Sequence, residues 1–188
     1  MKLLSSTFLL IFILFSVVCF CQNNSINGVG VSTGLTGFYD FQSYGGAINY
    51  LEMNPTDTNR IHAIYMTAPD STSPLSYRRT KCNFSSNGGT SWGIPVSVPS
   101  FRSGYPSLTL NPYFGYTATI ASHALDTNFV GLVSQLFCEK SEGNLAFNDT
   151  GYTPSYLGDG SNEPYYPQVA ATTNGNTVML ATLSSGGS

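Results

Sequence analysis

Short runs of alternating apolar and polar residues, separated by turn sequences, predict a chain of β-strands rather than helices. Asn-Pro-Thr-Asp at residues 54–57 marks a turn between the first two strands, and Ser-Ser-Asn-Gly-Gly-Thr-Ser-Trp at residues 85–92 marks the tip of a later hairpin. The first group of strands is predicted at residues 47–52, 60–67, 75–84 and 92–98.

The hairpin tip carries several features that stabilise a turn. The Asn87 side chain can fold back onto backbone N–H groups, and Gly88 or Gly89 can adopt a positive φ without a Cβ clash. Trp92, the single tryptophan of the chain, can cover the turn with its ring. We therefore interpret residues 85–92 as a folding element and not as a reactive site.

The strand pattern then repeats twice. Gly46, Pro106 and Pro167 occupy equivalent positions, separated by steps of 60 and 61 residues. The second group of strands is predicted at residues 105–110, 116–122, 129–139 and, more weakly, 144–148, and the third at residues 166–170 and 177–183. A strand-only repeat of this length indicates the four-stranded antiparallel blade of a β-propeller.

About two and a half blades would fit in this chain, with starts near residues 46, 106 and 167. A propeller closes with about four to eight blades. We therefore interpret residues 22–188 as a partial propeller in the N-terminal part of a longer protein, with the remaining blades C-terminal to it.

Residues 1–21 have the layout of a secretory signal peptide, with one lysine, an apolar run at residues 8–15 and small residues before Gln22. The unbroken apolar run is shorter than the roughly 20 residues of a membrane-spanning helix. We expect cleavage after Cys21, a mature chain without a membrane span, and a secreted or cell-surface location. An uncleaved anchor and a lipoprotein anchor are the alternatives.

Composition and charge agree with an exported β protein. Only 9% of the residues are charged, and the net charge is −3 without a basic cluster, which excludes the electrostatic footprint of a nucleic-acid or anionic-membrane binder. The one basic run is Arg78-Arg79 with Lys81. Neighbouring residues of a strand point to opposite faces, so we interpret this run as a solvated outer strand.

Cysteine and histidine positions give no metal site. Cys82 and Cys138 fall on corresponding strands of neighbouring blades, farther apart than the roughly 7 Å between Cα atoms that a disulfide tolerates, so we favour free thiols over a bridge. His62 and His123 lie at opposite ends of their strands, which predicts structural roles. Zinc-type and calcium-type spacings are absent from the sequence, and we expect no metal and no cofactor.

The residues Ser85-x-Asn87-x-Gly89-Thr90-x-Trp92 resemble the Asp box, or bacterial neuraminidase repeat, of sialidase-type β-propellers, whose pattern is Ser-x-Asp-x-Gly-x-Thr-Trp. In that family the box has a structural role at the turn between the third and fourth strands of a blade, which is where the hairpin is predicted. Asn87 replaces the usual aspartate, and residues 139–152 contain no second box. The resemblance implies about six blades in the full protein.

Two further resemblances concern export and catalysis. The leader ending in Cys-Gln and the aromatic sequence at residues 37–46 resemble large exported proteins of the Bacteroidetes type. Sialidases of this fold use an arginine triad, a Tyr-Glu nucleophile pair and an Asp acid/base. Phe101-Arg102 followed by Tyr105-Pro106 is a distant counterpart of their Phe-Arg-Ile-Pro motif, with two residues inserted and a position after the box, and this departure argues against catalysis.

The repeat itself predicts a ligand-binding surface. The innermost strand of each blade begins near one mouth of the propeller channel, so residues before each repeat start should gather there. An aromatic mouth with an arginine and two acids would suit sugar rings, although the same tyrosines could serve only to pack the blades. The candidate residues are Asp40, Tyr44, Arg102, Tyr105, Glu163, Tyr165 and Tyr166.

These observations favour a non-catalytic binding or scaffold module with a glycan or a surface protein as partner. The first alternative is a glycoside hydrolase of sialidase type whose other catalytic residues lie beyond Ser188. The second is a structural or adhesive repeat protein without a defined pocket.

Overall fold

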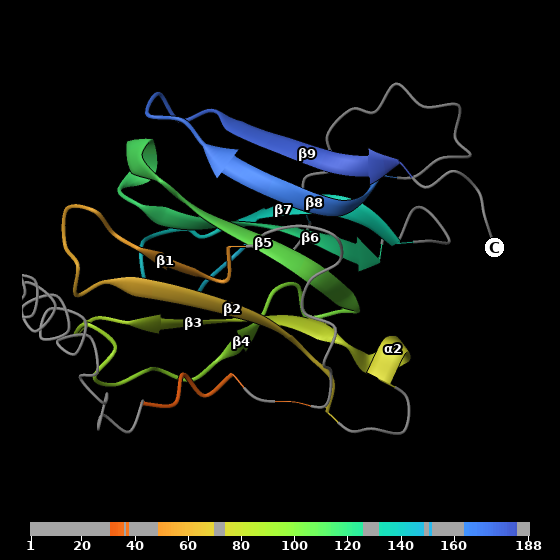
Figure 1. The fold of residues 1–188 in the computed structure, drawn as a ribbon, viewed down its shortest axis with the longest axis horizontal. Coiled ribbons are helices and arrows are strands. Elements are labelled where there is room, and N and C mark those ends of the chain that lie inside the picture. Colours follow the sequence, from red (N-terminus) through yellow and green to blue (C-terminus); the bar gives the residue numbers. More distant parts are fainter. Residues whose placement is uncertain are drawn as a thin grey trace, which may run out of the picture. The chain divides into compact units, whose positions relative to one another are not determined.

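The computed structural model describes residues 31–35, 37, 49–69, 74–125, 132–148, 151 and 164–183. These residues form three open antiparallel sheets, with one helical turn and one 3-10 turn between strands (Figure 1). The predicted all-β class with antiparallel sheets is therefore confirmed. The predicted leader at residues 1–21 lies outside the described residues.

The first sheet is a four-stranded meander in the order β1-β2-β3-β4. Its strands are β1 (Leu51–Met53), β2 (Ile61–Thr67), β3 (Arg79–Ser85) and β4 (Val96–Ser97). β2 and β3 pair along their whole length, from Ile61 opposite Ser85 to Thr67 opposite Arg79. The turn before β2 is closed by Asn54, whose Oδ1 accepts a hydrogen bond from the Thr56 backbone N–H at 2.9 Å.

The second and third sheets follow in the same manner. The second contains β5 (Ser103–Asn111), β6 (Thr117–Leu125) and β7 (Leu132–Cys138), and the third contains β8 (Pro164–Ala171) and β9 (Thr177–Leu183). The 3-10 turn η1 (Pro112–Phe114) connects β5 to β6. The fourth strand predicted at residues 144–148 is reduced to a single bridge, between Phe147 and Glu139.

Three predicted strands of the first sheet are wrong in extent. The strand predicted at residues 47–52 is β1, which begins only at Leu51 and ends at Met53. Residues 75–77 belong to the helical turn α2 (Pro74–Tyr77) and not to β3. β2 ends at Thr67 opposite Arg79, so the earlier residues have no strand beside them, and a proline suits the first turn of a helix. The strand predicted at residues 92–98 begins only at Val96, because Pro95 has no N–H to donate and the Gly93 carbonyl accepts from the Asn83 side chain.

The second sheet lies between the other two and is packed on both faces. Against the first sheet, Leu108, Ile120 and Phe137 form a core with Ile64 and Cys82. Against the third sheet, Ala121 and Leu136 pack with Val169 and Met179. Every residue of β6 from Thr117 to Ala124 is consequently buried, and its many alanine and serine side chains allow close packing on both sides.

Side-chain hydroxyls join β5 to β8 directly. Ser107 Oγ accepts a hydrogen bond from the Val169 N–H at 3.1 Å, and Thr109 Oγ1 accepts one from the Ala171 N–H at 3.2 Å. The buried polar residues of β5 therefore have a structural explanation, because they take over part of the backbone pairing that a neighbouring strand would otherwise supply.

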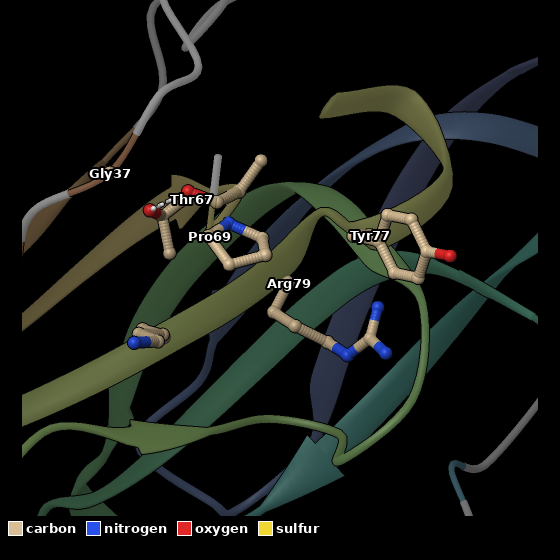
Figure 2. A pocket seen from close by; sticks show the side chains of 7 residues that line it. Gly37, Thr67, Pro69, Tyr77 and Arg79 are labelled. Carbon is tan, nitrogen blue, oxygen red and sulfur yellow. Dashed lines mark hydrogen bonds between the residues drawn. The ribbon is translucent and has the colours of Figure 1, made fainter. Parts of the chain in front are cut away.

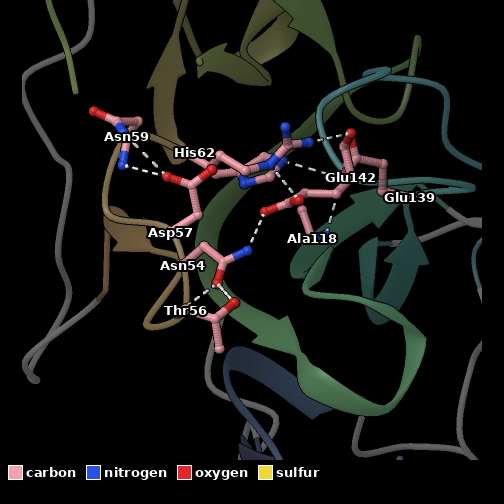
Figure 3. Close-up of polar contacts among 9 residues, drawn as sticks. Asn54, Thr56, Asp57, Asn59, His62, Ala118, Glu139 and Glu142 are labelled. Carbon is pink, nitrogen blue, oxygen red and sulfur yellow. Dashed lines mark hydrogen bonds and ion pairs between the residues drawn. The ribbon is translucent and has the colours of Figure 1, made fainter. Parts of the chain in front are cut away.

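A buried polar network joins the first sheet to the second at the opposite end of β2 from α2 (Figure 3). His62 Nε2 donates to Glu139 Oε2 at 3.0 Å, and both side chains are fully buried. The same Glu139 carboxylate accepts hydrogen bonds from the backbone N–H groups of Ala118 and Leu145, at 3.0 and 2.9 Å. A buried carboxylate thus has three donors, taken from β2, β6 and the loop after β7.

A second pair of residues extends this network toward solvent. Arg60 forms an ion pair with Glu142, and its guanidinium also lies over the Phe84 ring, 5.2 Å from the ring centroid. Asn54 Nδ2 donates to Glu142 Oε1 at 2.7 Å. The turn before β2 and the loop after β7 are therefore held together by charge-assisted hydrogen bonds.

The two described cysteines are both free thiols, in agreement with the favoured prediction. Cys82 is buried in the core, where burial raises the pKa of its thiol well above the ordinary value, and Cys138 is exposed. Among the described residues, no helix has the length and apolar character needed to cross a membrane.

Candidate functional site

Five side chains meet near the starts of β3, β5 and β8 and the end of β6, and form what we call the aromatic–arginine cluster: Arg78, Tyr105, His123, Tyr165 and Tyr166. The Tyr105 and Tyr166 rings meet edge to face, with centroids 4.9 Å apart. The His123 and Tyr165 rings do the same at 4.3 Å. Arg78 and His123 are each only 4% exposed, whereas the three tyrosines are half-buried, so the tyrosines form the accessible part of the cluster.

Two β-bulges position the tyrosines. The register of β5 against β6 shifts between Gly104 and Ser107, and the register of β8 against β9 shifts between Tyr165 and Gln168. Tyr105 and Tyr166 lie within these shifts and have φ values of 48° and 54°. A bulge re-aims a side chain, and a left-handed residue other than glycine costs about 1–3 kcal/mol, a strain that is common at functional sites.

Arg78 lies beneath Tyr105. Its guanidinium carbon is 5.0 Å from the Tyr105 ring centroid, a cation–π arrangement. Gly104 makes this approach feasible, because a Cβ at that position would lie 2.4 Å from Met66 Sδ and 3.0 Å from Arg78 Nε. Arg78 Nε is buried and has no hydrogen-bond partner in the described part of the chain. A buried cation of this kind favours polar or anionic groups that can reach it.

His123 is held in its neutral form. Burial lowers the pKa of its ring from the ordinary value of 6.5 to about 3; the backbone at Leu132 opposes the shift, whereas the charges of Arg78 and Arg102 add to it. The imidazole packs against Tyr105, Tyr165 and Tyr166 without becoming a third positive charge. The cluster is thus a cationic, aromatic surface with a neutral histidine at its base.

Four of the seven residues predicted at the channel mouth can be placed. Tyr105, Tyr165 and Tyr166 lie together in the cluster, and Arg102 lies close enough for its charge to affect His123. Asp40, Tyr44 and Glu163 are outside the described residues. No group of three or more potential metal ligands occurs within the described ranges.

Sequence reasoning missed Arg78 and His123. Arg78 was interpreted as part of a solvated strand, and this is wrong, because its side chain is buried. The available signal was its spacing: Arg78, Thr80 and Cys82 alternate with Arg79 and Lys81, and Thr80 and Cys82 are also buried. His123 was assigned a structural role, and its packing among the tyrosines makes it part of the cluster instead of an isolated core residue.

The turn at residues 85–92 lies at the far end of β3 from Arg78, and its local geometry agrees with the prediction. Ser85 Oγ accepts a hydrogen bond from the Gly89 N–H at 2.9 Å and donates one to Asn87 Oδ1 at 3.0 Å. Asn87 Oδ1 also accepts from the Ser91 N–H at 2.9 Å.

Gly88 and Gly89 of the same turn both have positive φ, 68° and 81°. Of the other box residues, Thr90 donates its backbone N–H to the Asn87 carbonyl, and the Trp92 ring lies beside Gly89.

Replacing Ser85 with alanine should lower the free energy of unfolding by about 1–2 kcal/mol, because a buried hydroxyl that satisfies the turn would be lost. Urea denaturation followed by Trp92 fluorescence measures this change. The matched control is Ser97→Ala, at an exposed position of β4, which should change stability by less than about 0.5 kcal/mol. Equal effects of the two substitutions would contradict a stabilising role for the Ser85 hydroxyl.

Comparisons of the chain with protein-family models, with curated proteins and with solved structures found no match. The functional argument therefore depends on the geometry of the site and on the resemblance of the turn at residues 85–92.

Proposed function

We propose that this chain is part of an exported, sialidase-like β-propeller that binds carbohydrate through the aromatic–arginine cluster without catalysing a reaction. In this proposal the three sheets are consecutive blades, and the protein is secreted or attached to the cell surface. The observation that carries the proposal is the convergence of bulged Tyr105 and Tyr166 above buried Arg78.

Support for the propeller comes from how the sheets follow one another. The first two are antiparallel meanders and the third is an antiparallel strand pair, and the second packs its two faces against the first and the third. The same bulge with a left-handed tyrosine recurs at the start of β5 and of β8, 61 residues apart. In a propeller, such equivalent starts surround one mouth of the central channel.

Support for carbohydrate as the ligand comes from the chemistry of the cluster. Half-buried tyrosine rings present apolar faces for the C–H groups of a sugar together with hydroxyls that hydrogen-bond to its own. Arg78 adds N–H donors at the base of the cluster. The positive φ of two tyrosines strains the backbone and lowers the stability of the fold. In this proposal, sugar binding is the function that compensates for that strain.

Binding is favoured over hydrolysis because glycosidases need two carboxyl groups at the scissile bond. Among the described residues, the cluster contains one cation and several aromatic rings but no carboxylate. The Glu139 carboxylate is buried in the network at the other end of β2, where it is occupied by three donors.

The test is a glycan-array screen of the protein, followed by titration of the best-binding glycan against Tyr166→Gly. Glycine adopts a φ of 54° without strain, so this substitution removes the ring while it relieves the backbone. We expect glycan binding to weaken by about 3- to 10-fold or more, which corresponds to the binding free energy of one aromatic contact.

Tyr113→Ala is the control, because Tyr113 is an exposed tyrosine in η1, at the far end of β5 from Tyr105. It should bind the glycan as the unmodified protein does. Unchanged binding by folded Tyr166→Gly would refute the proposed site, and release of a fluorogenic sialoside would favour the hydrolase alternative. The absence of any glycan ligand would favour the adhesive one.

A further inference from the structure

A separate pocket lies on the face of the first sheet that is turned away from the second sheet, and we call it the Arg79 pocket (Figure 2). Its volume is about 620 Å³, which is within the range of small-molecule sites. The residues that matter for its chemistry are Thr67 and Pro69 after the end of β2, Tyr77 of α2, and Arg79 and Lys81 of β3.

Strand alternation explains why two cations line this pocket. Arg79 and Lys81 are two residues apart on β3 and therefore lie on the same face, opposite Thr67 and Tyr65 of β2. Thr80, between them, is fully buried toward the second sheet, where its Oγ1 hydrogen-bonds to Ser122 Oγ at 2.8 Å. The Arg79 pocket thus lies on the face of the first sheet opposite to the buried Thr80 side chain.

The Arg79 guanidinium is fixed by backbone carbonyls. Its Nε donates to the Ser100 carbonyl at 3.1 Å, and its Nη1 donates to the Arg78 carbonyl at 2.9 Å. Neither of these partners carries a charge, so the positive charge is held in place but not neutralised. Nη2 makes no hydrogen bond within the described residues and remains available as a donor.

No carboxylate in the described part of the chain pairs with Arg79 or Lys81, although Arg60 has Glu142 as its partner. The contrast is informative because the chain carries only seven lysines and arginines and a net charge of −3. Two cations in one pocket, neither of them paired with a carboxylate of the described residues, point to an anionic ligand. An arginine and a lysine on the same face of one strand suit a carboxylate, since the guanidinium offers directed donors and the ammonium a compact charge.

Tyr77 and Pro69 supply the apolar part of the pocket. The Tyr77 side chain is 55% exposed although it lines the pocket, so its ring presents a large accessible surface there. Exposed tyrosine rings stack against the C–H faces of sugars and leave the hydroxyl group free for hydrogen bonds. An apolar wall beside two cations matches a ligand with both a ring and an acid group.

We propose that the Arg79 pocket binds a carboxylated sugar of the uronic-acid type, with its carboxylate on Arg79 and Lys81 and its ring against Tyr77. This site is independent of the aromatic–arginine cluster and would stand even if the cluster bound nothing. Together the two sites would let the chain contact both neutral and acidic sugar units.

The experiment is an NMR titration of the labelled protein with glucuronate, with glucose and acetate as separate probes for the ring and the acid. We expect glucuronate to bind more tightly than either probe, with chemical-shift changes at Tyr77, Arg79 and Lys81. In the double variant Arg79→Gln/Lys81→Gln, glucuronate binding should weaken about tenfold or more, because charge-assisted hydrogen bonds are lost.

The matched control is Lys140→Gln, which removes one exposed positive charge from the loop after β7 and should leave glucuronate binding unchanged. Lys81→Gln alone preserves the carbonyl contacts of Arg79, so it tests the proposal if the double variant does not fold; we expect about threefold weaker binding. Unchanged binding in folded Lys81→Gln, equal weakening by Lys140→Gln, or glucuronate binding no tighter than acetate would each overturn the proposal.

Discussion

Replacing Glu139 with alanine is expected to lower the free energy of unfolding by about 3–5 kcal/mol. The Glu139 carboxylate accepts hydrogen bonds from His62, from the Ala118 N–H and from the Leu145 N–H, and it is one of the buried polar connections between the first and second sheets. Its removal leaves three buried donors without an acceptor, and each unsatisfied group costs about 1–3 kcal/mol.

Urea denaturation followed by Trp92 fluorescence measures this loss, with Glu52→Ala as the control. Glu52 lies in the neighbouring strand β1 and accepts one exposed hydrogen bond, from Asn49 Nδ2 at 2.9 Å. Its removal should therefore cost less than about 1 kcal/mol. If Glu139→Ala is no less stable than Glu52→Ala, the network does not join the sheets energetically.

The second large effect is a loss of folding stability at acidic pH. The pKa of His123 is about 3 in the folded protein and about 6.5 in an unfolded chain. Between these two values the unfolded state binds one more proton than the folded state, so stability is lost as the pH falls from about 6.5 toward 3. The slope from this single group approaches about 1.4 kcal/mol per pH unit.

His123→Phe provides the comparison, because phenylalanine keeps an aromatic ring beside Tyr165 and cannot be protonated. The difference in unfolding free energy between the two proteins should change with pH only across this interval. The His123 ring signals in an NMR titration should remain those of the neutral form down to about pH 4. Titration of His123 near pH 6.5 in the folded protein would contradict this explanation.

The sequence predicted well those strands that are set by a local pattern, and it predicted poorly those elements that depend on contacts across the sheet. β2, β6 and β9 alternate or are continuously apolar between clear turns, and their positions were predicted to within a few residues. α2 and the shortened β4 were not, because both depend on which residues find a partner across the sheet. The hydrogen bond from Asn83 to Gly93 that helps to limit β4 joins residues ten positions apart, which a periodicity of two does not reveal.

The sequence predicted the three tyrosines of the candidate site, but it did not predict that Arg78 and His123 lie beneath them. Tyr105, Tyr165 and Tyr166 follow from the repeat, because equivalent strand starts lie near one another. Composition does not distinguish Arg78 from Arg79. The alternation of Arg78 with Thr80 and Cys82 indicates which residues share a face, and the packing of the second sheet decides that this face is buried. The left-handed φ of Tyr105 and Tyr166 is likewise invisible to residue propensities, which would place glycine or asparagine there.

The position of β6, buried along both of its faces, limits how the chain can be divided. The sequence repeats about every 60 residues, yet a cut between any two sheets would open a core that both sheets share. The repeats are therefore not separable folding units, and the three sheets should unfold in one cooperative transition. Expression boundaries chosen from the repeat alone would split this unit, so useful truncations must keep β1 to β9 together.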